Sequence, residues 1–198
     1  KNRIYERDKM EIRKSYQSIT FGKTPVMICE VKRKSDQQRI KATLYKMDLK
    51  NHNDLDEIKY SKTTKSLYYD AEKDSRNFSP YRDYYLLKAD DTKEVISGLS
   101  VTSHFRRGEE RTCGLSFVVD AMEGNNKYVS STDPILAYLE NEAINNYREN
   151  IIIGNGDIDE KNLRREKFTK SKIGKWFLPQ QRFTQLIDQA EKRYNMVI

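Results

Sequence analysis

The sequence predicts an α+β fold of mixed α/β character, with a single central, mostly antiparallel sheet flanked by helices. Three observations predict it. Apolar residues alternate with polar ones across residues 84–120, and turn residues separate the runs, as in a strand meander. Apolar residues with helical spacing dominate on both sides of that region. The 198 residues are enough for one sizeable core.

We expect three segments within this fold. Residues 1–22 form an N-terminal helical extension, because apolar residues recur there at helical intervals among charges. Residues 23–178 form the α/β domain, and residues 179–198 form a C-terminal helix after Pro179. Additional helices at both ends therefore flank the sheet.

Composition excludes several classes of protein. The chain has 13 Tyr and 7 Phe, and aromatic residues make up 11% of it, whereas disordered chains are poor in such residues. No apolar run approaches the ~20 residues that a membrane-spanning helix needs, so we expect no membrane span. The opening residues KNRIYERDKMEIRK are too charged for the apolar core of a signal peptide, so we expect an intracellular, cytoplasmic protein. Cys29 and Cys113 lie in or beside apolar runs without metal-ligand spacing, which favours structural thiols and no metal site.

The net charge of +7 comes from the two ends of the chain. Residues 1–50 hold 14 basic and 6 acidic residues, whereas residues 51–150 hold 13 basic and 18 acidic ones. A cationic rim around a nearly neutral or acidic centre fits a phosphorylated small ligand or a partner surface better than a long nucleic acid.

The first third of the chain is the hardest part to interpret. Residues 26–31, VMICEV, are β-branched and apolar and predict a strand. Residues 36–48 predict a helix, because Ile40, Leu44 and Met47 recur every three or four positions. Residues 50–80 are polar and predict a loop with one short helix.

The remaining elements follow in order. Three strands are expected at residues 84–89, 95–105 and 112–120, followed by a loop, a helix from Asp133 and a buried strand at residues 151–154. Within that helix we expect Glu140 and Glu142 on the solvated side. A basic helix at residues 160–172 comes next, and a last helix has Phe183, Ile187, Ala190 and Tyr194 on one face.

The second half of the chain resembles the GNAT N-acyltransferase superfamily. The segment ILAYLENEAINNYRENIIIGNGD is similar to the helix and fifth strand of that family, and YYLLKADDTKEVISGLSV is similar to its hairpin. NLRREKFTKSKIGKWF is similar to the family's Asn-led helix, with Asn162, Phe168 and Gly174 at the usual spacing. The resemblance covers about 95 residues and implies transfer of an acyl group from acyl-CoA to a small-molecule or protein amine. The length also resembles the acyl-homoserine-lactone synthases, a branch without the usual glycine signature.

The resemblance implies a set of site residues. His104, Asp120 and Tyr128 are the catalytic candidates, the first two as general base and Tyr128 as the acid that protonates the departing thiolate. Asn125, Lys127 and Ser130 would face the pyrophosphate, although Gly124 lies too early for the family's usual loop and Asp133 occupies the helix start. The resemblance also implies that the pantetheine arm is held by the backbone of Ser116, Phe117, Val118 and Val119. Asn162, the first residue of the Asn-led helix, completes the implied cofactor site.

Two other functions remain open. A strand ending in Glu30 and Lys32 has the Glu-x-Lys spacing of PD-(D/E)xK nucleases, where carboxylates hold Mg²⁺. Alternatively, a non-enzymatic module would contact phosphates or nucleic acid through the basic helix at residues 161–175. The terminal helices would then be free to bind a protein partner.

Overall fold

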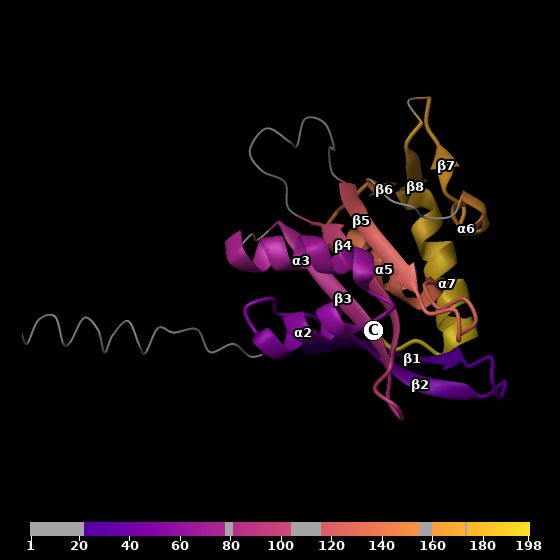
Figure 1. Ribbon diagram of the computed structural model, residues 1–198. Coiled ribbons are helices and arrows are strands. Elements are labelled where there is room, and N and C mark those ends of the chain that lie inside the picture. The colour runs from indigo at the N-terminus through magenta and orange to yellow at the C-terminus, as the bar shows by residue number, and fades with distance from the viewer. Residues whose placement is uncertain (1–21, 78–80, 104–115, 155–159, 173) are drawn as a thin grey trace, which may run out of the picture.

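A computed structural model describes residues 22–77, 81–103, 116–154, 160–172 and 174–198. Within these residues the chain forms one eight-stranded sheet, in the order β1-β2-β3-β4-β5-β6-β8-β7, with helices on both faces (Figure 1). The α+β prediction is confirmed. The strands are β1 (Thr24–Lys32), β2 (Arg39–Lys46), β3 (Arg82–Ala89), β4 (Val95–Thr102), β5 (Ser116–Gly124), β6 (Asn150–Ile153), β7 (Thr169–Lys170) and β8 (Trp176–Pro179).

The helix predicted at residues 36–48 is wrong, because β2 occupies this segment. Ile40, Ala42 and Leu44 are all buried and alternate with more exposed residues, so the period is two. The sequence prediction did not count Ala42 as a core residue. Without Ala42, the four-residue spacing of Ile40 and Leu44 also suits a helix. The short turn before β2 folds the strand back onto β1 in antiparallel pairing, which places both strands in the sheet.

Two helices follow where the sequence predicted a loop with one short helix. They are α2 (His52–Tyr60) and α3 (Lys65–Asn77). The side chain of Asn51 accepts hydrogen bonds from the backbone N–H groups of Asn53 and Asp54 and thereby caps α2. The two helices cover one face of the sheet and pack against it through apolar side chains. The core residues there are Met47, Ile58, Leu67, Ala71, Tyr84, Leu86 and Ala121.

The predicted meander is confirmed for β3, β4 and β5, which pair antiparallel in sequence order. Successive side chains of β3 point to opposite faces of the sheet, so this strand contributes residues to the core on both faces. Tyr84 and Leu86 pack under α2 and α3, whereas Tyr85 and Leu87 pack on the opposite face. The meander therefore separates two distinct apolar layers.

The opposite face of the sheet is covered by α5 (Asp133–Asn145) and α7 (Phe183–Tyr194). Helix α5 connects β5 to β6, which run parallel to each other. The apolar side of α7, predicted to be open to a partner protein, is instead buried in this chain's own core through Phe183 and Ile187. The predicted N-terminal helix lies outside the described residues.

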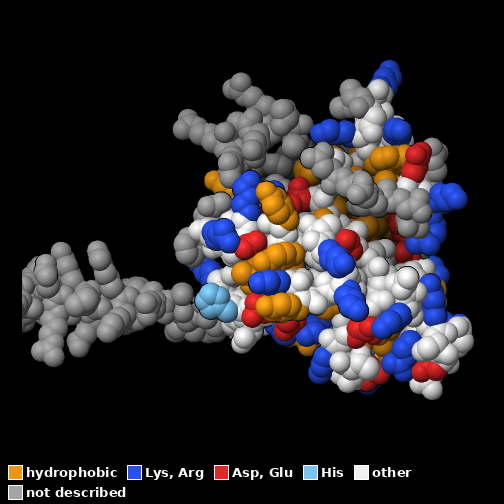
Figure 2. Space-filling view, in the orientation of Figure 1, with side chains coloured by type: hydrophobic (Ala, Val, Ile, Leu, Met, Phe, Trp, Pro, Cys, Tyr) orange, Lys and Arg blue, Asp and Glu red, His pale blue; other side chains and the backbone are white. Residues whose placement is uncertain are grey.

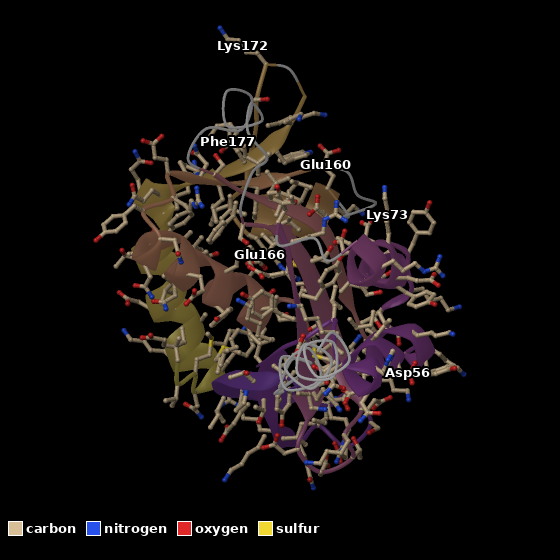
Figure 3. All side chains as sticks on the ribbon, turned by 90° about the vertical axis from the view of Figure 1, so that its left-hand side faces the viewer. Asp56, Lys73, Glu160, Glu166, Lys172 and Phe177 are labelled. Atoms are coloured by element: carbon tan, nitrogen blue, oxygen red, sulfur yellow. The ribbon has the colours of Figure 1, made fainter. Side chains whose placement is uncertain are left out.

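The basic helix predicted at residues 160–172 is mostly wrong. Helix α6 covers Glu160–Arg165 only, and Lys167 then takes a positive φ of 66° that ends the helical path. The chain continues into a hairpin of β7 and β8, with Lys172 at its tip (Figure 3). The basic side chains therefore do not form one helical face for phosphates.

The thiol of Cys29 is buried in the core, and burial raises its pKa to about 12. This fits the predicted structural role, whereas Cys113 lies outside the described residues. Within the residues that the structure describes, no helix is long and apolar enough to cross a membrane.

Candidate functional site

The sheet opens between β5 and β6. Their parallel pairing starts at Ser116 and Asn150 and stops at Val119 and Ile153, after which the Gly154 N–H still donates to the Val119 carbonyl, at 2.9 Å. Strand β5 continues through residues 120–124, and in the described part of the chain only β4 pairs with this stretch. One backbone edge of β5 is therefore open over roughly 13 Å.

A β-bulge marks the point where the two strands separate. Ser100 of β4 pairs with Ala121, and Val101 pairs with Val119, so Asp120 is the extra residue in β5. A bulge bends its strand and redirects a side chain, which is why bulges are common beside active sites. Here it directs the Asp120 carboxylate to the α3 side of the sheet, where its contacts lie.

The Asp120 carboxylate belongs to a charged cluster at this point. Its Oδ2 accepts a hydrogen bond from the Thr102 hydroxyl at 2.7 Å and forms an ion pair with Arg82, whose Nε lies 3.2 Å away. Arg82 also pairs with Asp70 and Asp74 of α3, at 3.3 and 3.4 Å. Burial is the main cause that raises the pKa of Asp120, and Thr102 and Arg82 act in the opposite direction. A half-buried carboxylate with a raised pKa beside an unpaired strand edge has the properties of a general base.

The open stretch of β5 ends at a large cavity. Gly124 lines this cavity of about 640 Å³, which lies between the α2–α3 turn, the β3–β4 hairpin and the start of the β5–α5 loop. Figure 2 shows basic side chains interspersed with hydrophobic ones on the face that α2 and α3 cover. Four lysines line the cavity, Lys62, Lys88, Lys93 and Lys127.

Two of the predicted pyrophosphate residues face this cavity. Asn125 donates a side-chain hydrogen bond to the Val95 carbonyl and accepts one from the Lys127 N–H, which fixes the turn after β5. The Lys127 ammonium pairs with Glu94 at 2.8 Å. Ser130 lies on the other side of the loop, where its carbonyl accepts the N–H of Asp133.

The start of α5 is a poor place for a phosphate. Asp133 is buried there, and Tyr194 of α7 donates its hydroxyl to the Asp133 carboxylate at 2.6 Å. Pro134 has no N–H to offer, and the N–H of Leu136 already donates to Thr132. A negative side chain therefore occupies the positive end of the helix, in place of a phosphate.

The structure also relocates the predicted strand site. The backbone of Ser116, Phe117, Val118 and Val119, expected to hold a pantetheine arm, is already paired with β6. The open edge begins one residue later, because β6 is only four residues long. The sequence pattern predicted strand β5 but not where its neighbour β6 ends.

Of the other predicted residues, Tyr128 lies away from Asp120. Tyr128 is buried and donates its hydroxyl to Glu94 at 2.9 Å, at the end of the sheet where the loop pairs with Arg33. Burial and that carboxylate raise the pKa of Tyr128 to about 12. His104 lies outside the described residues, as does the side chain of Asn162.

The predicted nuclease pair gains no support from its surroundings. Glu30 accepts a hydrogen bond from the side chain of Asn195 at 3.0 Å and lies 3.8 Å from Arg39, whereas Lys32 is exposed. Neither neighbour of Glu30 is a carboxylate that could share Mg²⁺. Across the described ranges, no group of three or more His, Cys, Asp or Glu could hold a metal ion.

The sequence missed two residues of interest. Arg82 precedes the alternating part of β3, and its partners come from α3, an element that was predicted as loop. Glu140 was predicted on the solvated side of α5, yet it is only 2% exposed. Its position could be inferred only from α7, which packs on α5 and covers that side.

Solved structures share this fold. A GNAT-family acetyltransferase from Staphylococcus aureus Mu50 aligns with a TM-score of 0.52 at 9% identity, over 70% of this chain and 99% of that chain. An uncharacterized protein from Bacillus halodurans aligns with a TM-score of 0.51 at 11% identity, over 86% of this chain and 97% of that chain. No family model matches the sequence, and no curated protein matches it. The chain therefore has the GNAT fold that its second half predicted.

Proposed function

We propose that the chain is an N-acyltransferase that moves an acyl group from acyl-CoA to an amine, with Asp120 as the general base. The observation that carries the proposal is the bulge at Asp120, where β5 separates from β6 and a half-buried carboxylate lies beside the unpaired edge. The shared fold supports the same conclusion, although a fold alone does not define a reaction. The narrower likeness to acyl-homoserine-lactone synthases stays a prediction.

Acyl-CoA, when bound, supplies a thioester carbonyl that is activated toward an amine. An amine is mostly protonated at neutral pH and must lose a proton before it can attack. Asp120 accepts this proton, and burial strengthens it as a base by raising its pKa. Thr102 and Arg82 hold the carboxylate in one orientation while the proton is transferred.

The described residues suit binding of some parts of acyl-CoA but not of others. Residues 120–124 offer an open strand edge, which can hydrogen-bond the amides of an extended pantetheine arm as an added strand would. The arm would then end near Gly124, where the lysines of the large cavity could hold phosphates. The start of α5 does not fit, because Asp133 lies there, and we assign no phosphate to it. Asn125 and Lys127 thus keep their proposed role, and Ser130 loses it.

Tyr128 is not part of the proposed chemistry, because its hydroxyl is given to Glu94 and a raised pKa makes it a weaker acid. His104 stays a prediction, since it lies outside the described residues. The acceptor class is an amine, either a small molecule or a protein group.

The test compares Asp120→Asn with Asp91→Asn, a matched change in the exposed β3–β4 turn. Loss of a general base lowers the rate by about 10² to 10⁴. We expect this loss in Asp120→Asn, with acyl-CoA affinity retained, and wild-type turnover in Asp91→Asn. Turnover of acetyl-CoA and longer acyl-CoAs with a panel of amines gives the rate, and thermal shift gives the affinity. Full activity in folded Asp120→Asn would remove Asp120 from the mechanism, and no binding of any acyl-CoA would reject the proposed function.

A further inference from the structure

A second cavity lies on the opposite face of the sheet, away from Asp120. It has a volume of about 130 Å³ and is enclosed by α5, the end of α6 and α7. Its acidic side chains lie at its base and are more buried than its basic ones, whose side chains are 52% exposed at Arg165 and 62% exposed at Arg193. The acidic residues are Asp133, Glu140 and Glu166, and the basic ones are Arg165, Lys167 and Arg193.

Asp133 already has its partners. Its carboxylate accepts a hydrogen bond from Tyr194 at 2.6 Å and from Arg165 at 3.3 Å, and Arg193 lies 4.0 Å away. These contacts connect α7 and α6 to the start of α5. Asp133 therefore has a structural role, and it adds negative charge beside the other two carboxyl groups.

Glu140 has no such partner. It is 2% exposed, it lines the cavity, and within the described structure its Oε2 has no hydrogen-bond partner. Buried polar atoms are nearly always bonded, and an exception commonly marks a water or ligand site. Burial and the nearby carboxylates of Glu166 and Asp133 raise the pKa of Glu140 well above its usual value.

Glu166 provides the second acceptor. It pairs with Arg165 Nε at 3.2 Å through Oε1. Burial, together with Asp133, raises the pKa of Glu166 to about 7. The cavity therefore holds two carboxyl groups whose pKa values lie above those of ordinary surface carboxylates.

We propose that this cavity binds the ammonium group of a small primary amine, with Glu140 and Glu166 as hydrogen-bond acceptors. An ammonium group has three N–H donors and no acceptor, so it can satisfy the orphaned Oε2 of Glu140 and share Glu166 with Arg165. The positive charge of the ammonium group also stabilises the ionised form of both carboxyl groups, so the protons that they hold are released when the amine binds. The site is independent of the proposed acyl transfer, because Asp120 contacts the α3 face of the sheet.

The charges around the cavity restrict the rest of the ligand. Arg165, Lys167 and Arg193 line the cavity, so a second positive charge on the ligand would meet like charges there. A tail that is neutral or negative avoids this repulsion. The preferred ligand class is therefore a small monoamine or an amino acid, and a diamine should bind more weakly.

The experiment measures binding to the full chain by calorimetry and thermal shift near pH 7, with ethylamine, β-alanine, 1,4-diaminobutane and tetramethylammonium as probes. We expect ethylamine and β-alanine to bind with release of protons, visible as a heat that depends on the buffer. We expect the diamine to bind more weakly. Tetramethylammonium, which has the charge but no N–H, should not bind.

Variants distinguish this site from general charge effects. Glu140→Gln should weaken ethylamine binding by about tenfold or more, because a charged acceptor is lost. Glu166→Gln should weaken it less, since Glu166 also serves Arg165. Glu142→Gln, on the same helix but outside the cavity, should leave binding unchanged. Equal binding of tetramethylammonium, unchanged binding in Glu140→Gln, or no binding of any probe would overturn the proposal.

Discussion

Two carboxyl groups with raised pKa values lie on opposite faces of the sheet, and their surroundings differ. Asp120, on the α3 face, accepts a hydrogen bond from Thr102 and forms an ion pair with Arg82. Glu140, on the α5–α7 face, is more deeply buried, and its Oε2 has no partner in the described structure. Burial raises the pKa of both groups, but only Asp120 is held in a fixed orientation. A satisfied carboxylate suits proton transfer at a set position, whereas an unsatisfied one suits a ligand that brings the missing donors.

The largest expected effect in this comparison comes from Arg82→Ala. This change leaves the carboxylates of Asp70, Asp74 and Asp120 close together without their shared cation, at a cost of about 3 kcal/mol in the free energy of unfolding. Because Arg82 lowers the pKa of Asp120, its removal should also move the acidic limb of the activity profile to higher pH. Urea denaturation and the pH dependence of kcat/KM measure the two effects.

Arg76→Ala is the matched control for that change. Arg76 is 74% exposed and pairs with Glu72, one helical turn earlier, so the expected cost is below about 0.5 kcal/mol. If Arg82→Ala behaved like this control, the cluster around Asp120 would not be a cooperative unit.

An intermediate effect is expected in the pH dependence of stability on the α5–α7 face. Glu166 has a raised pKa of about 7, so the folded state binds more protons than the unfolded state between about pH 4.5 and pH 7. The stabilising effect of this group is therefore complete below about pH 4.5 and is lost as the pH rises through about 7. Glu166→Gln should therefore flatten most of that pH dependence.

Unfolding curves from pH 4 to pH 8, for wild type and Glu166→Gln, test this prediction. Glu123→Gln is a suitable control, since Glu123 lies on the α3 face and accepts the Ser66 N–H. Parallel stability profiles for wild type and Glu166→Gln would show that the group titrates as an ordinary surface carboxylate.

The smallest effect is expected for Tyr194→Phe. It removes the hydroxyl that donates to Asp133 at 2.6 Å, but Arg165 remains as a partner, so the cost should be about 1 kcal/mol. Thermal unfolding measures it, and Tyr69→Phe, at a Tyr that is 74% exposed, is the control. A change no larger than the control's would mean that the Asp133 contact does not fasten α7 to α5.

The spacing of apolar residues along the sequence predicted those elements whose conformation depends mainly on their own residues. The meander, α5 and α7 follow from alternation, turn residues and helical spacing, and these patterns are unambiguous in long amphipathic segments. Strand β2 was missed because its spacing fits two periods, and α2 and α3 were missed because their apolar residues are few. In both cases the deciding force is pairing or packing with a distant segment.

Features of the candidate site that depend on distant segments of the chain were likewise not predictable from the sequence. Asp120 was predicted as a candidate base from its place at a strand end, but its bulge depends on the register between β4 and β5. Arg82 joins it only because β3 lies two strands away in the same sheet. The stretch predicted for the donor arm was displaced because the length of β6 limits the pairing of β5.

The sequence by itself determined the fold class, the strand meander and the likeness to the GNAT fold, and it predicted Asp120 as a candidate base. Only the tertiary structure decided where β5 loses its neighbour, that the basic segment after α6 is a hairpin, and that Glu140 is buried. The physical reason is that hydrophobic periodicity reports which face of an element is apolar, whereas burial of a charged group depends on what packs against it. For Glu140 that partner is α7, more than forty residues further along the chain.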